Sequence, residues 1–328
     1  MNFISLMKNL LCVVFGVFCL FALSSQSLAQ TTSKDDKSDT VCFHYKFLKG
    51  DSLLYRLVSQ DSIVFPVKDA VVKERVEIYM IICDSIGQNG HYYLSQTMVD
   101  YASKESSGSI RDQVRLKSSW LKRKVWFEID SLGNRYSYGA TDTTKADVSP
   151  GGAFQPNLFF PFKESCKRSN ESWIVKSLDE LPENSIPPAL REQLSLFRVL
   201  PDVDTLGQLC NRFQYTLTGQ GSVRIPYTTG QMLQTNSVIA QFGIMTISKE
   251  DNVPVHFFAT AEIKLTVKSH DGKELKGTQY INSNFKLVEF HSSRFDGGIK
   301  TFKKSTPTPT QVVTPLKKDT GKKKKSKK

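Results

Sequence analysis

The sequence predicts an all-β protein: one or more large curved antiparallel sheets, built from successive hairpins in two β-rich halves. Apolar and polar side chains alternate along much of the chain, most clearly over 257–268, where the odd-numbered positions are apolar. Clusters of Asp, Ser, Asn and Gly separate these runs and predict tight turns. The regular alternation of strands with helices that indicates a parallel sheet is absent.

The first half contains three predicted hairpins. Their strand pairs are 41–47 with 53–58 across the Lys49-Gly50-Asp51 turn, 76–83 with 92–101, and 125–129 with 136–138. The second half resumes with strands at 213–217, 238–247 and 257–268, and the last of these turns at 269–272 into a returning strand that ends near Phe290.

A seam rich in Pro, Gly and Phe separates the halves at 149–175, and its phenylalanines Phe154, Phe159, Phe160 and Phe162 are expected to be buried. One short helix is predicted at 187–199. Pro187 and Pro188 suit its first turn, Leu190, Leu194 and Phe197 recur at helical spacing, and Pro201 ends it.

The first residues predict export. Lys8 precedes an almost unbroken apolar run from Leu10 to Leu23, and Ser27-Leu28-Ala29 supplies small residues for cleavage, as in a secretory signal peptide. A retained membrane anchor is the alternative, and the short apolar run close to a cleavage site disfavours it. No later segment is long and apolar enough to span a membrane. The predicted location is the periplasm or outer envelope of a Gram-negative bacterium.

The chain divides into six predicted segments. They are a signal peptide (1–29), a disordered lead-in (30–40), an N-terminal β-rich half (41–148), the seam with the short helix (149–200), a C-terminal β-rich half (201–300) and a Thr/Pro spacer with a Lys-rich tail (301–328).

Most of the formal net charge of +12 lies in the tail, because residues 301–328 contain ten lysines and one aspartate. Nucleic acid is an unfavoured partner, since no aromatic residue is interleaved with these lysines. The simpler interpretation is a solvated tail, and the alternative is contact with an anionic envelope surface. The lysines proposed for that contact are Lys317, Lys318, Lys322, Lys323, Lys324, Lys325, Lys327 and Lys328.

Four cysteines follow the signal peptide: Cys42, Cys83, Cys166 and Cys210. An exported protein permits disulfides, so one or two structural disulfides and simple buried thiols are both open interpretations. Their wide spacing and the lack of a paired His/Cys motif predict no metal site, and no cofactor is predicted.

The sequence carries no HExxH, GxSxG or Walker-type motif. The five histidines, His44, His91, His256, His270 and His291, occur singly, and each is expected to be a structural or exposed side chain. A carboxylate pair drawn from Glu128, Glu262 and Glu289 would serve a glycan hydrolase, although solvated strand faces explain these residues equally well.

A short pattern, Asp followed by Ser or Thr and then an apolar residue or Thr, occurs seven times. Composition predicts roughly one or two. Turn formation explains part of the excess. The pattern also resembles the acceptor site of a periplasmic O-glycosylation system of some Gram-negative bacteria, which makes the middle residues candidate acceptors: Thr40, Ser52, Ser62, Ser85, Ser131, Thr143 and Thr205.

Short motifs occur in both halves of the chain. Tyr45-Lys46-Phe47 leads into Lys49-Gly50-Asp51 and Tyr55, and Pro161, Ser172 and Trp173 follow later. These motifs resemble those of a family of uncharacterised exported β-rich bacterial envelope proteins. The family carries a Gly-Asp-Ser-Trp step, in which this chain has Asn170 and Glu171 in place of Gly-Asp. The resemblance implies no established activity and no catalytic residues.

Two classes of function follow from these observations. The first is a non-catalytic envelope binding or scaffold protein, with a carrier of lipids or other hydrophobic ligands as a related form. In that form the sheet wraps around an apolar cavity and the 187–199 helix acts as a lid. The second is an envelope glycan hydrolase that uses two carboxylates.

Overall fold

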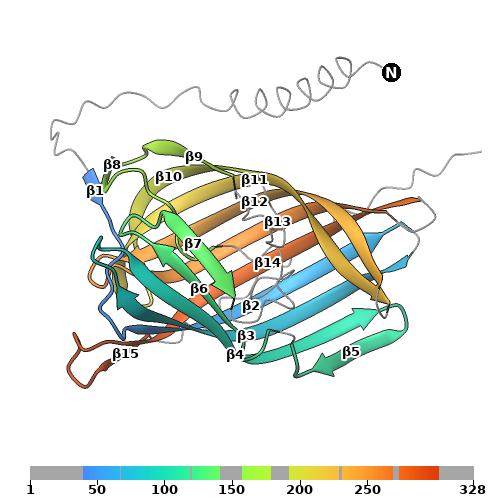
Figure 1. Cartoon of the computed structure of the whole chain (residues 1–328), viewed down its shortest axis with the longest axis horizontal. Coiled ribbons are helices and arrows are strands. Elements are labelled where there is room, and N and C mark those ends of the chain that lie inside the picture. The colour runs from blue at the N-terminus through green and yellow to red at the C-terminus, as the bar shows by residue number, and fades with distance from the viewer. Residues whose placement is uncertain are drawn as a thin grey trace, which may run out of the picture. The chain divides into compact units, whose positions relative to one another are not determined.

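The computed structural model describes residues 40–66, 68–118, 120–140, 157–178, 192–228, 231–268 and 273–302, and every regular element in them is a β-strand (Figure 1). The all-β prediction is therefore confirmed. The predicted signal peptide, almost all of the lead-in, Phe154, the turn at 269–272 and the tail after Phe302 lie outside the described residues.

The strands are long and follow one another with short connections. Their bounds are β1 Thr40–Cys42, β2 Ser52–Phe65, β3 Lys68–Ile86, β4 Tyr92–Ser107, β5 Ile110–Arg115, β6 Lys124–Ile129, β7 Arg135–Ala140, β8 Cys166–Arg168, β9 Ser172–Leu178, β10 Glu192–Thr205, β11 Gln208–Thr228, β12 Gln231–Ser248, β13 Pro254–Lys268, β14 Glu274–His291 and β15 Ile299–Thr301.

Thirteen strands form one antiparallel sheet in the order β7-β6-β4-β3-β2-β14-β13-β12-β11-β10-β9, with β15 beside β14 and β5 beside β4. Almost all neighbours are consecutive in sequence, as expected for successive hairpins. The exceptions are β4, which pairs with β6 as well as with β5, and β2, which pairs with β14 and so joins the strands of the two β-rich halves in a single sheet. Strands β1 and β8 form a separate pair.

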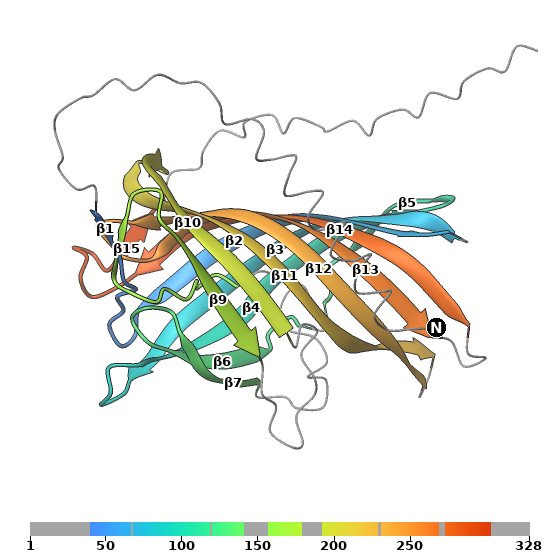
Figure 2. The same ribbon diagram turned by 90° about the horizontal axis from the view of Figure 1, so that it is seen from above.

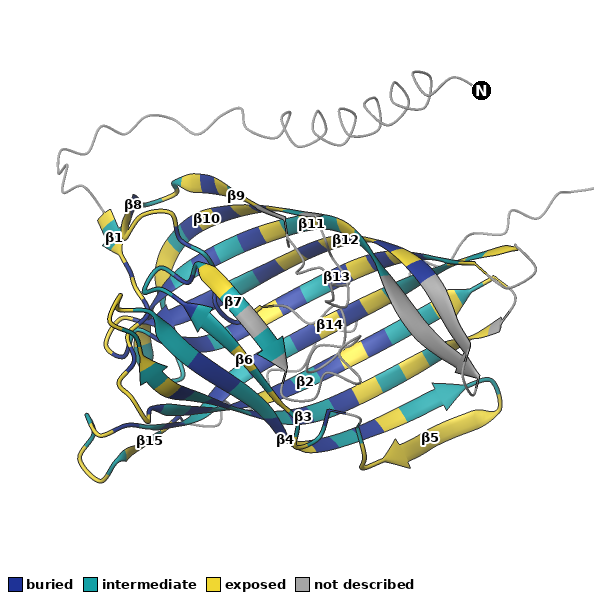
Figure 3. Ribbon diagram, viewed as in Figure 1, coloured by how far each residue is buried: buried dark blue, intermediate teal, exposed yellow. Residues whose placement is uncertain are grey.

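The sheet curls so that β6 and β7 lie in front of the central strands in Figure 1, and Figure 2 shows β9 and β10 turned toward the same side. We call the face enclosed by this curl the inner face. Along β2, β3, β13 and β14 the odd-numbered residues point to it and are mostly buried, which gives the alternating colours of Figure 3. The even-numbered residues of these strands form the outer face.

The helix predicted at 187–199 is wrong where the structure describes the chain, because β10 begins at Glu192. Residues 187–191 lie outside the described residues. Leu194 and Phe197 are three residues apart, but they lie on opposite faces: Leu194 is exposed and Phe197 is buried. Pairing with β9 and β11 satisfies the backbone groups, and this tertiary pairing outweighs the local helical spacing.

The hairpin predicted between 41–47 and 53–58 is also wrong. Strand β2 pairs with β3 and β14, whereas 43–47 crosses the end of the sheet. The amides of Phe43, Tyr45 and Lys46 donate to carbonyl groups of three separate loops, at Ser165, Ser131 and Asn252. The alternation of apolar residues in 43–47 correctly indicates burial on one side, but it does not fix the partner of the backbone.

Candidate ligand-binding face

Aromatic side chains close one end of the inner face. Residues 43–47 and 157–162, here called the plug, lie across this end and pack against both flanks of the sheet. Phe160 contacts Tyr215 and Phe257, with ring centroids 4.9 and 5.3 Å apart. Phe159 contacts Phe127 on the opposite flank, with centroids 5.8 Å apart. The seam thus supplies the buried phenylalanines that its composition predicts, and they hold the curl of the sheet together.

Tyr45 ties the two parts of the plug together. Its hydroxyl accepts a hydrogen bond from the amide of Phe160 at 2.8 Å and donates to the carbonyl of the same residue at 3.3 Å. The side chain is fully buried, and this burial raises the pKa of Tyr45 far above its ordinary value. The phenol therefore acts as a neutral donor and acceptor that fixes Phe160 in place.

A disulfide joins the outer edge of the plug. Cys42 on β1 bonds Cys166 on β8, two residues that pair across these strands and are separated by 124 positions in sequence. Cys83 and Cys210 are buried free thiols. Burial raises the pKa of the Cys83 thiol to about 12 and that of the Cys210 thiol to about 11, so neither is a nucleophile at neutral pH.

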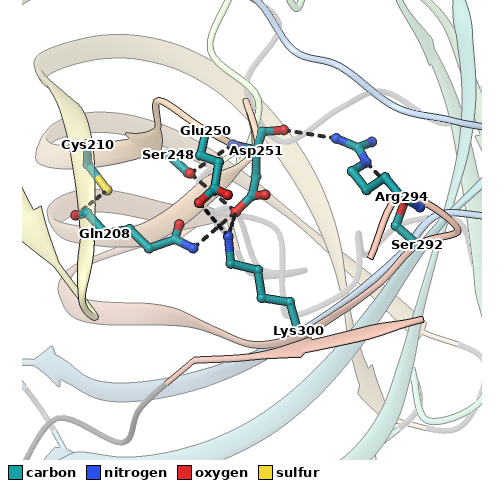
Figure 4. A network of polar contacts seen from close by, with 8 residues as sticks. All are labelled: Gln208, Cys210, Ser248, Glu250, Asp251, Ser292, Arg294 and Lys300. Atoms are coloured by element: carbon teal, nitrogen blue, oxygen red, sulfur yellow. Dashed lines mark hydrogen bonds and ion pairs between the residues drawn. The ribbon is translucent and has the colours of Figure 1, made fainter. Parts of the chain in front are cut away.

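A polar network fastens the turns at the plugged end (Figure 4). The buried carboxylate of Asp251 accepts hydrogen bonds from Lys300 at 2.7 Å, Gln208 at 3.1 Å and Ser248 at 3.3 Å. Burial opposes the charge on Lys300, but its bonds to Asp251 and Glu250 outweigh it and raise the lysine pKa. The carboxylate of Asp251 and the ammonium group of Lys300 are bonded to groups of the protein itself, so we interpret the network as structural, although the buried side-chain oxygen of Gln208 has no partner among the described residues.

The other end of the inner face is lined by a second, aliphatic cluster. Its buried members, Ile239, Ala261, Ile263, Leu265 and Ile281, lie on β12, β13 and β14, and Phe65 and Leu217 pack against them. Among the described residues, every member of this cluster belongs to the sheet itself. The plug, with its aromatic rings, belongs to the first cluster and not to this one.

Small residues on the strands shape both ends of the face. A Cβ added at Gly277 would lie 2.3 Å from the ring of Phe65, and one at Gly243 would lie 2.2 Å from the ring of Tyr215. The glycine at 277 therefore allows Phe65 to fold over the inner face beside the aliphatic cluster, and Gly243 gives the same close approach to the aromatic end.

Charged residues lie beside the aliphatic cluster on β2 and β3. Ile281 pairs with Asp61 across the strands, and the guanidinium of Arg75 reaches Asp61 at 3.0 Å and Glu77 at 2.9 Å. Ser59 and Tyr79 complete this group, which we call the ionic strip. Ser59 donates to Asp61 at 2.8 Å, and Tyr79 donates to Glu77 at 2.6 Å. Burial, and then the negative charge of Glu77, raise the pKa of Tyr79 well above its ordinary value.

Four inner-face hydroxyl groups have no hydrogen-bond partner among the described residues. They belong to Ser283 on β14, Ser103 on β4, Thr235 on β12 and Tyr215 on β11, and each residue is at most 3% exposed. Ser283 pairs with Ser59, and Ser103 pairs with Arg75, so two of the four flank the ionic strip. Buried hydroxyl groups are almost always bonded to protein or to a bound molecule. The inner face can thus offer apolar contact at one place and hydrogen bonds close by.

The candidate glycosylation residues do not share one setting. Thr40 is exposed on β1, and Ser131 and Thr205 lie in or beside turns. The other described candidates, Ser52, Ser62 and Ser85, lie within strands and are half-buried. Thr143 and the tail lysines Lys317–Lys328 lie outside the described residues.

The structure places the three candidate carboxylates on different strands. Glu128 on β6 accepts from His91 at 2.8 Å and Ser137 at 2.9 Å, and the bond from His91 is the main cause that lowers its pKa. Glu289 on β14 bonds His291 at 2.9 Å, and Glu262 is exposed on the outer face of β13. No interaction among the described residues joins any two of them.

The other predicted features have these positions. His256 bonds Asn284 at 3.0 Å, His44 is exposed, and His270 lies outside the described residues. Within the described ranges no three His, Cys, Asp or Glu side chains gather as metal ligands would. The same ranges contain no helix with the length and hydrophobicity needed to cross a membrane.

No protein-family model and no curated protein matches this chain. One solved structure that resembles it is titled "Lipid-protein interactions in lipovitellin", with a TM-score of 0.42 and 12% sequence identity. The match covers 80% of this chain and 26% of the other, so the chain spans about a quarter of the length of that protein. A likeness of this size does not identify a function.

The ionic strip is the part of this face that the sequence analysis missed. A signal for it exists. Asp61 continues the odd-numbered series of Tyr55 and Leu57 on β2, and Glu77 precedes Tyr79 in the corresponding series on β3. Polar residues that continue a buried series indicate either the end of the core or a polar part of it.

Proposed function

We propose that this chain is a non-catalytic binding protein that holds a lipid-like ligand against the aliphatic end of the inner face. The single observation behind the proposal is that the second apolar cluster, among the described residues, is made of sheet residues alone. Its five buried members are at most 7% exposed, so their side chains already lie in an apolar environment, in which each methylene group removed from water contributes about 0.8 kcal/mol. We assign the hydrocarbon part of the ligand to that environment.

The chemistry of the face supports an alkyl chain in particular. The cluster is dominated by Ile and Leu, and Phe65 is the one aromatic residue packed against it in the part of the chain that the structure describes. Branched aliphatic side chains conform to a flexible chain, and binding pockets for such ligands combine apolar walls with few polar groups. The unpartnered hydroxyl of Ser283 and the ionic strip would then receive the polar end of the ligand.

The location of the protein is a proposal drawn from the sequence. The N-terminal apolar segment supports export, and an envelope protein would meet lipid-like ligands there. The lysines at 317–328 would add contact with an anionic envelope surface. Fractionation of the native host followed by immunoblotting tests the location, and recovery in the cytoplasm would contradict it.

The proposed ligand site is tested with a dansylated undecanoic acid, whose fluorescence rises in an apolar environment. We expect saturable binding to the wild-type chain, and at least tenfold weaker binding to I239S. The matched control is V238S, the adjacent residue on the outer face, since Val238 is 54% exposed and Ile239 is 1% exposed. The control is expected to bind as the wild type does.

A second variant separates loss of binding from loss of folding. I281F keeps the site apolar but fills space beside the ionic strip, so it is expected to weaken binding while urea unfolding still begins from a folded protein. An absence of fluorescence change with the wild-type chain would contradict the proposal. Equal effects of V238S and I239S would contradict it as well.

A further inference from the structure

A shallow groove crosses the outer face over β11–β14, and we propose that it binds a neutral oligosaccharide of glucose-like configuration without cleaving it. Its walls are the rings of Phe242 and Tyr280, and its lining includes Ala240, Thr260, Glu262 and Asn282. Most of its lining residues are even-numbered and lie on the face opposite the aliphatic cluster, while Gln241 and Ala261 also border it and Ala261 is shared with that cluster. The aromatic and polar groups that carry the inference belong to the outer face, so the inference does not rest on the lipid-like ligand proposed above.

The strand register creates the groove. Phe242 pairs with Thr260, and Thr260 pairs with Asn282 on the next strand. One step along the same face, Glu262 pairs with Ala240 on one side and Tyr280 on the other. The two aromatic rings thus stand at diagonally opposite corners, and the short side chains of Ala240 and Thr260 leave a depression between them.

Both aromatic residues are open to solvent. Phe242 is 38% exposed and Tyr280 is 47% exposed, although both are large apolar side chains on a sheet that buries many others. Exposed apolar surface rimmed by polar groups marks interaction sites. Both side chains line the groove, so they offer aromatic surface to a ligand that enters it.

Hydrogen-bonding groups accompany the rings. Within the described residues, no hydrogen bond or ion pair engages the side chain of Glu262, Asn282 or Thr260. Glu262 offers a carboxylate acceptor, Asn282 offers both a donor and an acceptor, and the Thr260 hydroxyl offers either. All three residues line the same groove as the two aromatic residues.

A sugar ring can contact both the aromatic residues and the hydrogen-bonding groups of this groove. In the glucose configuration the C–H groups point to the two faces of the ring, where the negative face of an aromatic side chain attracts them, and the hydroxyl groups point outward to polar partners. The carboxylate of Glu262 accepts hydrogen bonds from neutral hydroxyl groups and repels an anionic sugar. A neutral oligosaccharide is therefore the class that fits.

The groove is suited to binding and not to hydrolysis. Glycosidases place two carboxyl groups about 5 to 10 Å apart on either side of the scissile bond. Among the residues that line this groove, Glu262 is the one carboxylate. The bound oligosaccharide is accordingly expected to leave the protein unchanged.

Titration calorimetry of the full chain with cellohexaose and with maltohexaose tests the inference. We expect saturable binding of at least one of them, weakened at least fivefold by F242A and by Y280A. F258A is the matched control, since Phe258 is a 36% exposed aromatic residue on the same face outside the groove. It is expected to bind as the wild type does.

The oligosaccharide experiment can fail independently of the fatty-acid binding experiment. Binding of neither oligosaccharide, equal binding by F242A and wild type, or shortened oligosaccharides after incubation would each overturn the inference. E262Q keeps a hydrogen-bonding group and is expected to retain binding within about threefold, and to gain affinity for cellohexaose modified with a carboxylate. Binding of the dansylated fatty acid is expected to be unchanged in all four variants.

Discussion

Replacement of Arg75 by Met tests the energetics of the ionic strip. The Arg75 side chain is 10% exposed, and its guanidinium contacts Asp61 at 3.0 Å and Glu77 at 2.9 Å. R75M keeps most of the side-chain volume but leaves two carboxylates, 9% and 1% exposed, without their cation. Loss of one partner from a buried ion pair costs about 3–5 kcal/mol, because the remaining charge is desolvated and unpaired. We expect the free energy of unfolding to fall by that amount.

Urea unfolding followed by tryptophan fluorescence measures this change. The matched control is R56M on β2, because Arg56 is exposed on the outer face and is expected to change stability by less than about 0.5 kcal/mol. The triple variant D61N/R75M/E77Q removes all three charges, and it should recover most of the loss. A loss in R75M no larger than that in R56M would refute the claim that the strip is a buried, mutually dependent group.

Three further predictions concern other parts of the fold. Replacing Cys42 and Cys166 by Ser opens a loop of 124 residues and is expected to lower the unfolding free energy by about 2–5 kcal/mol in thermal or urea unfolding, whereas an unchanged midpoint would contradict this. Iodoacetamide at pH 8 should label neither Cys83 nor Cys210 in the native protein and both after denaturation, since burial raises both thiol pKa values; rapid native labelling would show that the thiols are accessible. Burial lowers the pKa of His256, so the unfolded state binds a proton more readily than the folded state does. The free energy of unfolding should therefore decrease as the pH falls below the ordinary histidine pKa of about 6.5. An equal decrease in H256Q would show that His256 is not the cause.

Alternating side chains were sufficient to predict the class of this fold, because one face of almost every strand is buried. The odd-numbered residues of β13 illustrate this, since Phe257 and Ile263 are both buried on the inner face. The pattern did not predict which strands pair. Strand β2 pairs with β14 through contacts between residues more than 200 positions apart in sequence. The local sequence of either strand does not predict this partner.

Two wrong predictions show where tertiary pairing outweighs the local sequence pattern. The spacing of Leu194 and Phe197 fits a helix and a strand alike, and the pairing of β10 with two neighbours decides between them. Residues 43–47 have strand-like alternation, but their amides donate to loop carbonyl groups and not to a neighbouring strand. In this position the segment covers the apolar side chains at the end of the curled sheet.

The sequence predicted part of the candidate site. An apolar inner face follows from alternation, and the aromatic seam correctly predicted buried rings such as Phe160. The division of that face into an aromatic end, an ionic strip and an aliphatic end depends on register. Asp61 meets Ile281 because β2 and β14 pair in one alignment, and a shift of one residue would place a different side of β2 against it.

The central claim, that the aliphatic end of the inner face holds a lipid-like ligand, is tested most directly by photo-cross-linking. A fatty acid with a diazirine in its alkyl chain would be bound to the full chain, irradiated, and its adducts located by peptide mass spectrometry. The account predicts adducts at Ile239, Ile263 and Ile281 that excess unlabelled fatty acid prevents. Adducts on outer-face neighbours such as Val238, or labelling that the unlabelled fatty acid does not reduce, would contradict it.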